Sequence, residues 1–383
     1  MKVIYIIDTN HPNVANGSNV ALLNILDEIK KYNVEPMVIA AHEGSLTEEL
    51  KKRKISFKIT HHQCHIYPRV KSIKNAIAFV PRLLQLLFRN YKAKLKLINI
   101  IEEFKPNIIH TNIGQLQLGY KVAKKLNIPH VWHIREYQDL ALGMTPIPSK
   151  SVFINRLNSS INYSIAITKG IYNHYKMKNN ASVIYDGVLK ENKIQFKDRK
   201  DDYFLFLGRL NEQKGISELI DAFIDFSKFN DNFKLLIAGD GSENFINNLK
   251  NKVIQSDLSK RIHFLGYRND ISELLSNATA LVVPSKNEGF GFITVEAMFN
   301  GCLVVGNNSG GTKEIIEPEN LGLLYIGHTD LVLKLKEIVT LGIDYYNETI
   351  KKAQINASRL YSQEQNALQI INLYKEILIK NKK

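Results

Sequence analysis

The stretch that decides the fold is Pro284–Gly301, PSKNEGFGFITVEAMFNG, which follows the short apolar run Ala280–Val283. The apolar run predicts a β-strand, and we expect a helix to begin near Thr294. A strand, a glycine-containing loop and a helix in this order are typical of doubly wound α/β domains. Glycines let the backbone approach a ligand closely, and the start of a helix offers free N–H groups that suit a diphosphate.

Two carboxylates of this stretch, Glu288 and Glu296, are eight residues apart. We expect Glu296 in the first turn of the helix, so that both carboxylates can face the same ligand. Ionised carboxylates only accept hydrogen bonds, and they therefore suit pairs of vicinal hydroxyls on sugars. A purely structural interpretation stays open, in which Glu296 complements the helix dipole and Glu288 is a loop charge.

A second informative stretch, Phe206–Gly215, reads FLGRLNEQKG. Arg209 follows a predicted strand directly, and Lys214 precedes a predicted helix. Two cations at the carboxyl end of a strand can form a phosphate clamp, Arg through its planar fork and Lys as a point charge. The alternative is a pair of solvated surface cations, which is the commoner fate of these residues.

Two further glycine turns follow predicted strands of the same half: Ala238–Ser242 (AGDGS) and Ser309–Glu314 (SGGTKE). Each turn alone is a weak signal, because such turns are routine between a strand and a helix. Four glycine or cation turns at four strand ends of one half-chain together indicate a ligand site.

The rest of the chain repeats the alternation of apolar runs and helical patterns. Most of the runs are apolar on both faces, as parallel strands covered by helices are, and thirteen strands suit two doubly wound sheets better than one. We expect the break near Lys190–Asp202, and the ligand site in the cleft between the two domains. The predicted domains are 1–190, 191–362 and a terminal segment 363–383 containing a helix over Gln363–Lys380. The predicted strands are Lys2–Ile7, Glu35–Ala40, Ser56–Ile59, Asn107–His110, His130–Ile134, Ser164–Ile167, Ser182–Tyr185, Tyr203–Leu207, Phe233–Ala238, Arg261–Leu265, Ala280–Val283, Leu303–Val305 and Leu321–Tyr325.

Length and composition agree with two globular domains. The chain has 383 residues, of which 44% are hydrophobic. No apolar run approaches the roughly 18–20 residues of a membrane helix, and Pro81 interrupts the best candidate, Ala76–Phe88. The two cysteines, Cys64 and Cys302, argue against a disulfide scaffold or a thiolate metal site and fit a reducing cytoplasm.

The positive charge is concentrated in the first half. Residues 1–190 hold 27 basic and 12 acidic residues, and residues 51–100 hold 13 Lys or Arg without any Asp or Glu. Such a block suggests a polyanionic neighbour, either nucleic acid or an anionic membrane surface. The alternative is that these charges coat solvated helices. No RRM, KH or zinc module supports nucleic-acid binding.

The first half also carries polar residues after predicted strands. Gly17 ends a long polar loop after the first strand, and His133, Arg135 and Glu136 (HIRE) follow the fifth. A histidine at the carboxyl end of a strand is a candidate acid, base or ligand. The chain contains no HExxH, Walker A, GxGxxG or D-x-D pattern.

Taken together, these motifs resemble the retaining glycosyltransferases of family 4 (glycosyl transferases group 1), which have the GT-B fold of two Rossmann-like domains facing across a cleft. The resemblance spans nearly the whole chain. It rests on GRLNEQKG (208–215), AGDGS (238–242), EGFGFITVE (288–296), SGGTKE (309–314) and YDGV (185–188).

The resemblance implies roles for individual residues. The first domain would bind the acceptor and the second the nucleotide-sugar donor. Arg209 and Lys214 would hold the donor diphosphate, Glu288 the transferred sugar, Glu296 the ribose, and His133 would lie near the reacting carbon. Where the family often has Gly-Gly, this chain has Asn16-Gly17. Further donor contacts would come from Gly17, Gly208, Asp240, Gly241, Gly289, Phe290 and Gly291, and acceptor contacts from Asn16, Arg135 and Glu136.

The resemblance also implies a reaction and a location. We expect transfer with retention from a nucleotide-sugar to a saccharide or an undecaprenyl-type lipid-linked acceptor, in surface polysaccharide or glycoconjugate synthesis, without a metal or cofactor. A UDP-sugar is favoured over a GDP-sugar, although the residues leave the base open. The basic first domain would dock peripherally on the anionic inner face of the cell membrane. The alternatives are a sugar-nucleotide epimerase or hydrolase on the same fold, or a non-catalytic sugar-nucleotide-binding protein.

Overall fold

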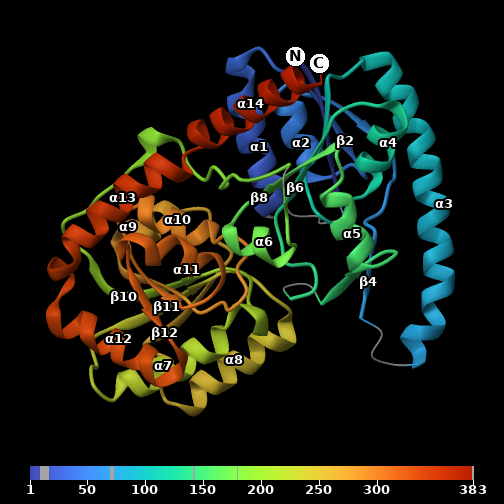
Figure 1. Ribbon diagram of the computed structural model, residues 1–383. Coiled ribbons are helices and arrows are strands. Elements are labelled where there is room, and N and C mark those ends of the chain that lie inside the picture. Colours follow the sequence, from blue (N-terminus) through green and yellow to red (C-terminus); the bar gives the residue numbers. More distant parts are fainter. Residues whose placement is uncertain (9–16, 70–72, 141–142, 179, 382–383) are drawn as a thin grey trace. The chain divides into compact units, whose positions relative to one another are not determined.

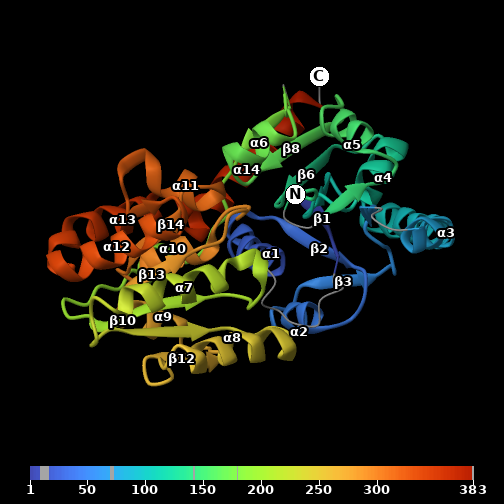
Figure 2. The ribbon, with the colours of Figure 1, turned by 90° about the horizontal axis from the view of Figure 1, so that it is seen from below.

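The computed structural model describes residues 1–8, 17–69, 73–140, 143–178 and 180–381 (Figures 1 and 2). The chain divides into two compact units. Unit 1 consists of Met1–Gly187 together with Gln363–Lys383, and unit 2 is Val188–Ser362. The predicted boundaries were 190 and 362.

The described part of unit 1 is built on a seven-stranded parallel sheet. The chain runs outward from β1 to β3, then returns to the middle at β5 and runs outward in the other direction. The topological switch therefore lies between β1 and β5. In spatial order the strands are β3 (Ser56–Ile59), β2 (Glu35–Ala40), β1 (Lys2–Ile7), β5 (Ile108–Thr111), β6 (His130–Ile134), β8 (Asn162–Ala166) and β9 (Ala181–Val183).

Helices cover both faces of this sheet, as parallel strands require. Alternate side chains of β1 point to opposite faces. Tyr5 belongs to one core cluster, with apolar residues of α1, α2 and α14, whereas Ile4 and Ile6 belong to another, with residues of α3 and α4. The last helix of the chain, α14, is thus part of the core of unit 1 and packs against α1 (Figure 1). The helices of this unit are α1 (Gly17–Ile29), α2 (Ser45–Lys52), α3 (Ile73–Phe104), α4 (Leu118–Leu126), α5 (Lys150–Leu157), α6 (Lys169–His174) and α14 (Gln363–Lys380).

Unit 2 carries a six-stranded parallel sheet. Here the chain runs from β10 outward to β12, then returns to the other side of β10, so the topological switch lies between β10 and β13. One core cluster joins the sheet to α7, α8 and α12, and α10 packs against α9 and α13. In spatial order the strands are β12 (Ile262–Gly266), β11 (Lys234–Ala238), β10 (Asp201–Leu207), β13 (Ala278–Val283), β14 (Leu303–Asn307) and β15 (Leu323–Tyr325).

The helices of unit 2 alternate with these strands. Short 3-10 turns, including η3 (Glu212–Lys214), join several of the elements. The helices are α7 (Ile216–Ser227), α8 (Glu243–Gln255), α9 (Ile271–Asn277), α10 (Phe292–Phe299), α11 (Gly310–Ile316), α12 (Gly327–Leu341) and α13 (Asn347–Tyr361).

The predicted α/β class with two Rossmann-like sheets is confirmed. The bounds of β1, β2, β3 and β6 are those predicted, and the remaining predicted strands differ by one or two residues at one or both ends. Two strands were not predicted: β4 (Ile66–Pro68) and β7 (Met144–Pro146), which form a small antiparallel sheet.

The helix α3 contains a proline. It continues through Pro81 over 32 residues. Proline removes one backbone donor, and this loss is tolerated here on an exposed position of the helix. Within the described residues, no helix combines the length and hydropathy that a membrane span needs.

Candidate active site

The carboxyl ends of the central strands of unit 2 bring together the two motifs that the sequence singled out. Lys214 follows β10 and Glu288 follows β13, and these strands flank the topological switch. The Lys214 Nζ lies 2.5 Å from Glu288 Oε1. Ligands of open α/β sheets bind at this position. The two charges, 74 residues apart in sequence, therefore mark the expected ligand site of this unit.

Gly215 explains how the two loops come so close. Its φ is 70°, and a Cβ there would lie 2.7 Å from the carbonyl oxygen of Pro284. Only glycine fits both the left-handed backbone and this approach. On the other side of Lys214, the Asn211 side chain accepts a hydrogen bond from the Lys214 backbone N–H at 3.1 Å. The backbone of Lys214 is thus fixed on both sides.

The Gly-Gly turn of SGGTKE supports the loop that carries Glu288. The backbone N–H of Gly311 donates to the Glu288 carbonyl at 2.9 Å, and the Ser309 hydroxyl donates to the Lys286 carbonyl at 2.8 Å. A Cβ on Gly311 would lie 2.0 Å from the carbonyl oxygen of Phe290. This turn therefore serves close packing of loop on loop, which places Glu288.

The GRL and AGDGS loops pack against each other in the same way. Gly208 donates to the Ala238 carbonyl at 3.1 Å, and Leu210 donates to the Asp240 carbonyl at 2.8 Å. A Cβ on Gly239 would lie 1.8 Å from the Gly208 carbonyl oxygen. The Asp240 side chain is exposed and accepts a hydrogen bond from the N–H of Gly241. This contact gives the predicted residues Gly208, Asp240 and Gly241 a structural role beside any contact with a ligand.

Arg209 is the cation of this site that is free to bind an anion. Its side chain is exposed, and it forms no ion pair with any residue that the structure describes. It follows β10 directly, five residues before Lys214. An unpaired guanidinium next to a lysine at a strand end can take both oxygens of a phosphate group.

Glu296 lies one turn farther along its helix than we expected, and the residue is half-buried. The helix α10 begins at Phe292 rather than near Thr294, so Glu296 falls in its second turn and not in the first. Burial raises the pKa of the Glu296 carboxyl to about 7. The helix-dipole interpretation of this residue weakens, because that effect is confined to the first turn.

At the start of α10, backbone groups rather than side chains are available to a ligand. Gly291 is its N-cap, with φ 108°. The Phe290 ring is buried and packs against Phe292 and Tyr361, so only the backbone of Phe290 can face a ligand. Together with Gly289, these residues carry the glycine turn that the sequence predicted next to a donor.

Unit 1 holds a second polar cluster, at the carboxyl end of β6. The His133 side chain is fully buried, and its Nδ1 accepts a hydrogen bond from Arg135 at 3.2 Å. Its Nε2 has no hydrogen-bond partner among the described residues, and Asp186 Oδ1 is 3.9 Å away. Burial, followed by the Arg135 charge, holds the pKa of His133 well below its usual value. His133 is thus a neutral imidazole with a free N–H to donate.

Arg135 holds this cluster together. Its Nε donates to the carbonyl of Asn112 at 3.0 Å, its Nη2 to the Asn112 side chain at 3.0 Å, and its Nη1 to the Asp186 carboxylate. Asp186 and Asn112 are partners to which the sequence analysis gave no role. Asp186 lies within the YDGV motif, which was the available signal, but its pairing with Arg135 over 51 residues is not visible in a motif.

Glu136 completes the HIRE segment. Burial raises the pKa of its carboxyl to about 7, although the Arg135 charge acts in the opposite direction. Its Oε1 has no hydrogen-bond partner among the described residues. Gly17 is the exposed first residue of α1. Asn16 lies outside the described residues.

Comparisons with known proteins agree with this arrangement. Residues 189–356 match the family model "Glycosyl transferases group 1". The chain is 31% identical over 287 residues to an uncharacterised glycosyltransferase of Methanocaldococcus jannaschii, covering 73% of this chain and 78% of that protein. It is 26% identical to the alpha-monoglucosyldiacylglycerol synthase of Streptococcus pneumoniae, covering 68% of this chain and 65% of that protein.

Solved structures confirm the fold. The chain is similar to a glycosyltransferase from Rickettsia africae, with a TM-score of 0.79 at 19% identity over 98% of both chains. It is also similar to Anabaena HepE in complex with UDP and glucose, with a TM-score of 0.75 at 20% identity over 98% of this chain and 99% of the other.

Two Rossmann-like sheets with this similarity define the GT-B fold. The chain belongs to the glycosyl transferases group 1 family, family 4, and is a glycosyltransferase (EC 2.4) that is retaining by family. Membership in this family favours a transferase over the epimerase, the hydrolase and the non-catalytic binding protein, which the residues alone had left open.

Proposed function

We propose that this chain transfers a sugar, with retention, from a UDP-sugar to a saccharide or lipid-linked saccharide acceptor in surface polysaccharide or glycoconjugate synthesis. The observation that carries the proposal is the contact between Lys214 and Glu288 at the topological switch of unit 2. The UDP in the HepE complexes supports UDP as the nucleotide. The synthase of Streptococcus pneumoniae, whose name states a diacylglycerol product, supports a lipid-linked acceptor.

Each charged residue of the site would bind a different part of the donor. Breaking the bond between sugar and diphosphate builds negative charge on the leaving group. Arg209 and Lys214 would stabilise that negative charge where it forms. The backbone N–H groups at the start of α10 would stabilise it further. Without donor, Glu288 neutralises Lys214. In the complex, Glu288 would instead accept hydrogen bonds from the hydroxyls of the transferred sugar.

The remaining predicted residues would bind the rest of the two substrates. Glu296 would accept hydrogen bonds from the ribose hydroxyls. On the acceptor side, His133 offers a neutral N–H donor that no described residue uses. Arg135 and Glu136 would hold that histidine and its surroundings in place, because the Arg135 guanidinium already bonds to Asn112, His133 and Asp186.

The test is nucleotide release from a panel of UDP- and GDP-sugars by the purified full chain. Release from one donor, reduced about 100-fold or more in both Lys214→Ala and Glu288→Ala, would support the proposal, because one preorganised charge contributes on the order of 100- to 1,000-fold. Lys286→Ala is the matched control, since Lys286 lies in the same loop but pairs with Glu218. Equal release by wild type and both variants would refute the assignment of these two residues.

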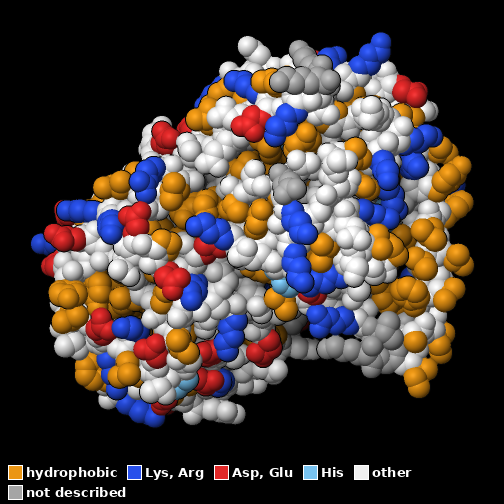
Figure 3. All heavy atoms as spheres, viewed as in Figure 1, with side chains coloured by type: hydrophobic (Ala, Val, Ile, Leu, Met, Phe, Trp, Pro, Cys, Tyr) orange, Lys and Arg blue, Asp and Glu red, His pale blue; other side chains and the backbone are white. Residues whose placement is uncertain are grey.

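We also propose that unit 1 docks on an anionic membrane surface through α3. Apolar residues on one face of this helix are exposed although they recur every three or four residues, the spacing of a single stripe. Figure 3 shows hydrophobic side chains gathered over α3. A basic stripe runs beside the apolar one, and this pairing is typical of helices that lie in a membrane interface. The apolar stripe comprises Ile73, Ile77, Val80, Leu84, Leu87, Phe88, Tyr91 and Leu95, and the basic stripe Arg82, Arg89, Lys92 and Lys96.

Vesicle sedimentation tests this docking. The full chain is expected to pellet with phosphatidylglycerol vesicles at low salt and to remain in solution with phosphatidylcholine vesicles. Changing Leu84 and Leu87 to Ser should reduce the bound fraction severalfold. Ile254→Ser in unit 2 is the matched control, because Ile254 is 65% exposed and lies outside α3. Equal recovery on both kinds of vesicle would refute the proposal.

A further inference from the structure

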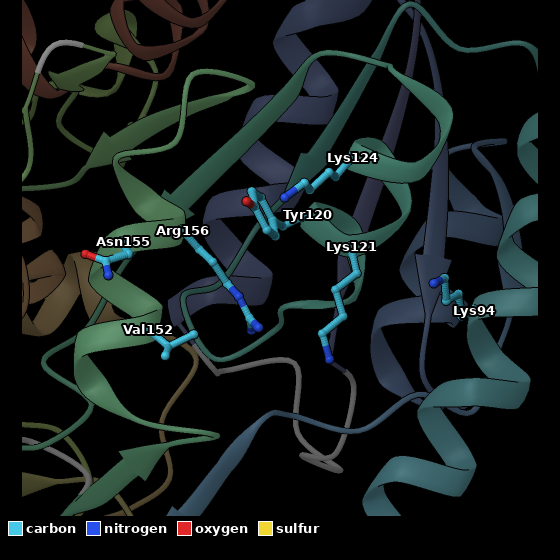
Figure 4. A pocket seen from close by; sticks show the side chains of 7 residues that line it. All are labelled: Lys94, Tyr120, Lys121, Lys124, Val152, Asn155 and Arg156. Atoms are coloured by element: carbon cyan, nitrogen blue, oxygen red, sulfur yellow. The ribbon is translucent and has the colours of Figure 1, made fainter.

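A hollow of about 400 Å³ lies on the surface of unit 1, and six of the seven residues that line it carry a hydrogen-bond donor in the side chain. It lies between α3, α4 and α5, and Figure 4 shows Lys121 of α4 between Arg156 of α5 and Lys94 of α3. Figure 3 shows Lys and Arg side chains gathered in this region beside the apolar side chains of α3. The lining residues are Lys94, Tyr120, Lys121, Lys124, Val152, Asn155 and Arg156.

The four cations of this hollow are not neutralised. Among the residues that the structure describes, no carboxylate forms an ion pair with any of them. The Lys121 ammonium contacts His65 Nε2 at 3.1 Å, and Arg156 donates to the side chain of Gln117. Lys94, Lys121 and Arg156 are partly buried. Clustered, partly buried cations without counter-charge raise the free energy of the free protein, and a bound anion would offset that cost.

Burial and the neighbouring positive charges act in the same direction on the pKa of the central lysine, Lys121. Burial, followed by the charges of Arg156 and Lys94, lowers the pKa of Lys121 to about 8. His65 brings no negative charge to balance Lys121. Burial, followed by the Lys121 charge, holds the pKa of His65 well below its usual value, so the imidazole is neutral. An anion seated here would favour the charged form of Lys121 and raise its pKa.

We propose that this hollow, the α3–α4–α5 pocket, is a binding site for a phosphate-bearing group, best a diphosphate. Four positive charges, one of them a planar guanidinium, match the charge and oxygen geometry of two neighbouring phosphates better than a single carboxylate. Its volume falls in the range of roughly 300–1,000 Å³ of ligand pockets and exceeds what one small ion fills. Tyr120 and Asn155 add a hydroxyl and an amide donor.

The site differs from the donor site of unit 2 in residues and in chemistry. It contains no carboxylate to bind sugar or ribose hydroxyls, whereas the donor site has Glu288 and Glu296. The pocket therefore offers the cationic donors that a phosphate needs but not the carboxylates that bind sugar hydroxyls in the donor site. Two sources share this chemistry: a free phosphate ester, and the headgroup of a membrane lipid next to α3. The proposal stands independently of which donor sugar the enzyme takes.

The test follows the acylation of Lys121 in the full chain by an amine-reactive ester at a pH of about 8, with fragment-ion mass spectrometry to separate neighbouring lysines. Inorganic pyrophosphate should slow acylation of Lys121 at least about threefold relative to chloride at equal ionic strength, because a bound anion favours the unreactive ammonium. Lys125, exposed on the same helix but outside the pocket, is the internal control. Arg156→Gln should weaken protection by pyrophosphate at least about tenfold, whereas Lys214→Gln should leave it unchanged.

Vesicles distinguish the two sources. Protection by pyrophosphate indicates a free phosphate ester, and protection only by phosphatidylglycerol vesicles indicates a lipid headgroup. Equal protection of Lys121 and Lys125 would mean general screening and would overturn the proposal. So would protection that Arg156→Gln leaves intact, or no protection in any arm. Nucleotide release from the donor plays no part in this readout, so failure here and failure of the proposed donor chemistry are distinguishable.

Discussion

Replacing Gly215 by Ala tests whether one close backbone approach holds the donor site together. Gly215 has φ 70°, and its Cβ would lie 2.7 Å from the Pro284 carbonyl oxygen. Gly327 in the same unit has a similar φ of 74°, but a Cβ there would meet open space, with nothing within 4 Å. The pair Gly215→Ala and Gly327→Ala therefore separates the cost of the positive φ from the cost of the contact.

The structure sets the expected magnitudes. An alanine forced to a positive φ costs about 1–2 kcal/mol, so Gly327→Ala should lower the free energy of unfolding by about that amount. Gly215→Ala adds a clash that the loop after β13 must relieve, at about 1–3 kcal/mol for overpacking, giving roughly 2–5 kcal/mol together. For a unit of this size, each kcal/mol corresponds to about 2–4 °C in Tm.

Urea unfolding and nucleotide release are the two assays. Relief of the clash moves the Lys214 loop away from the Glu288 loop, so Gly215→Ala should lose at least about tenfold in release, measured well below its unfolding transition. Gly327→Ala should keep its activity. Equal losses of stability in the two variants would refute the idea that the Pro284 contact is rigid. Full activity in Gly215→Ala would refute the idea that this contact positions Lys214.

Two further predictions concern buried charges. The pKa of Glu296 is raised to about 7 by burial, so its contribution to folding is fully present below the unfolded pKa of about 4.5 and is lost as pH rises through 7. The fall in unfolding free energy from about pH 5 to pH 8 should therefore be smaller in Glu296→Gln than in the wild type. The donor affinity of the wild type should rise over the same pH range, because the carboxylate forms. Identical pH profiles of stability for the two proteins would contradict this prediction. Asp186→Asn leaves the Arg135 charge buried without its partner and should cost about 3–5 kcal/mol in urea unfolding. Asp139→Asn, which breaks the more exposed pair with Lys150, should cost about 1 kcal/mol or less, and similar losses in the two variants would count against a buried ion pair at Arg135.

The fold could be predicted because its signal is local. Strands buried on both faces read as continuous apolar runs, and β1 and β6 were therefore placed correctly from end to end. The pair β4 and β7 lacks this signal: each strand has three residues including a proline, and their pairing joins Ile66 to Pro146 across 80 residues.

In the candidate site, too, local features could be predicted from the sequence and long-range contacts could not. Position at a strand end could be predicted, and so Arg209, Lys214 and Glu288 were chosen from the sequence. The partners of these residues could not be predicted, since they depend on contacts such as Lys214 with Glu288 and Arg135 with Asp186 over 74 and 51 residues. The glycines were interpreted as ligand approaches, and the structure shows that Gly311 also packs one loop against another.

Residues 51–100 contain no Asp or Glu, but their positive charges are not all unbalanced. At its start, Lys51, Lys52 and Arg53 pair with carboxylates of the preceding α1 and α2, so that part is electrically balanced. Farther along, no cation of α3 with a described side chain forms an ion pair with a described residue. Part of the excess charge that could attract a polyanion is therefore carried by α3 and by the pocket that Lys94 shares with α4 and α5. The proposed membrane docking and the proposed phosphate binding thus both draw on cations of α3.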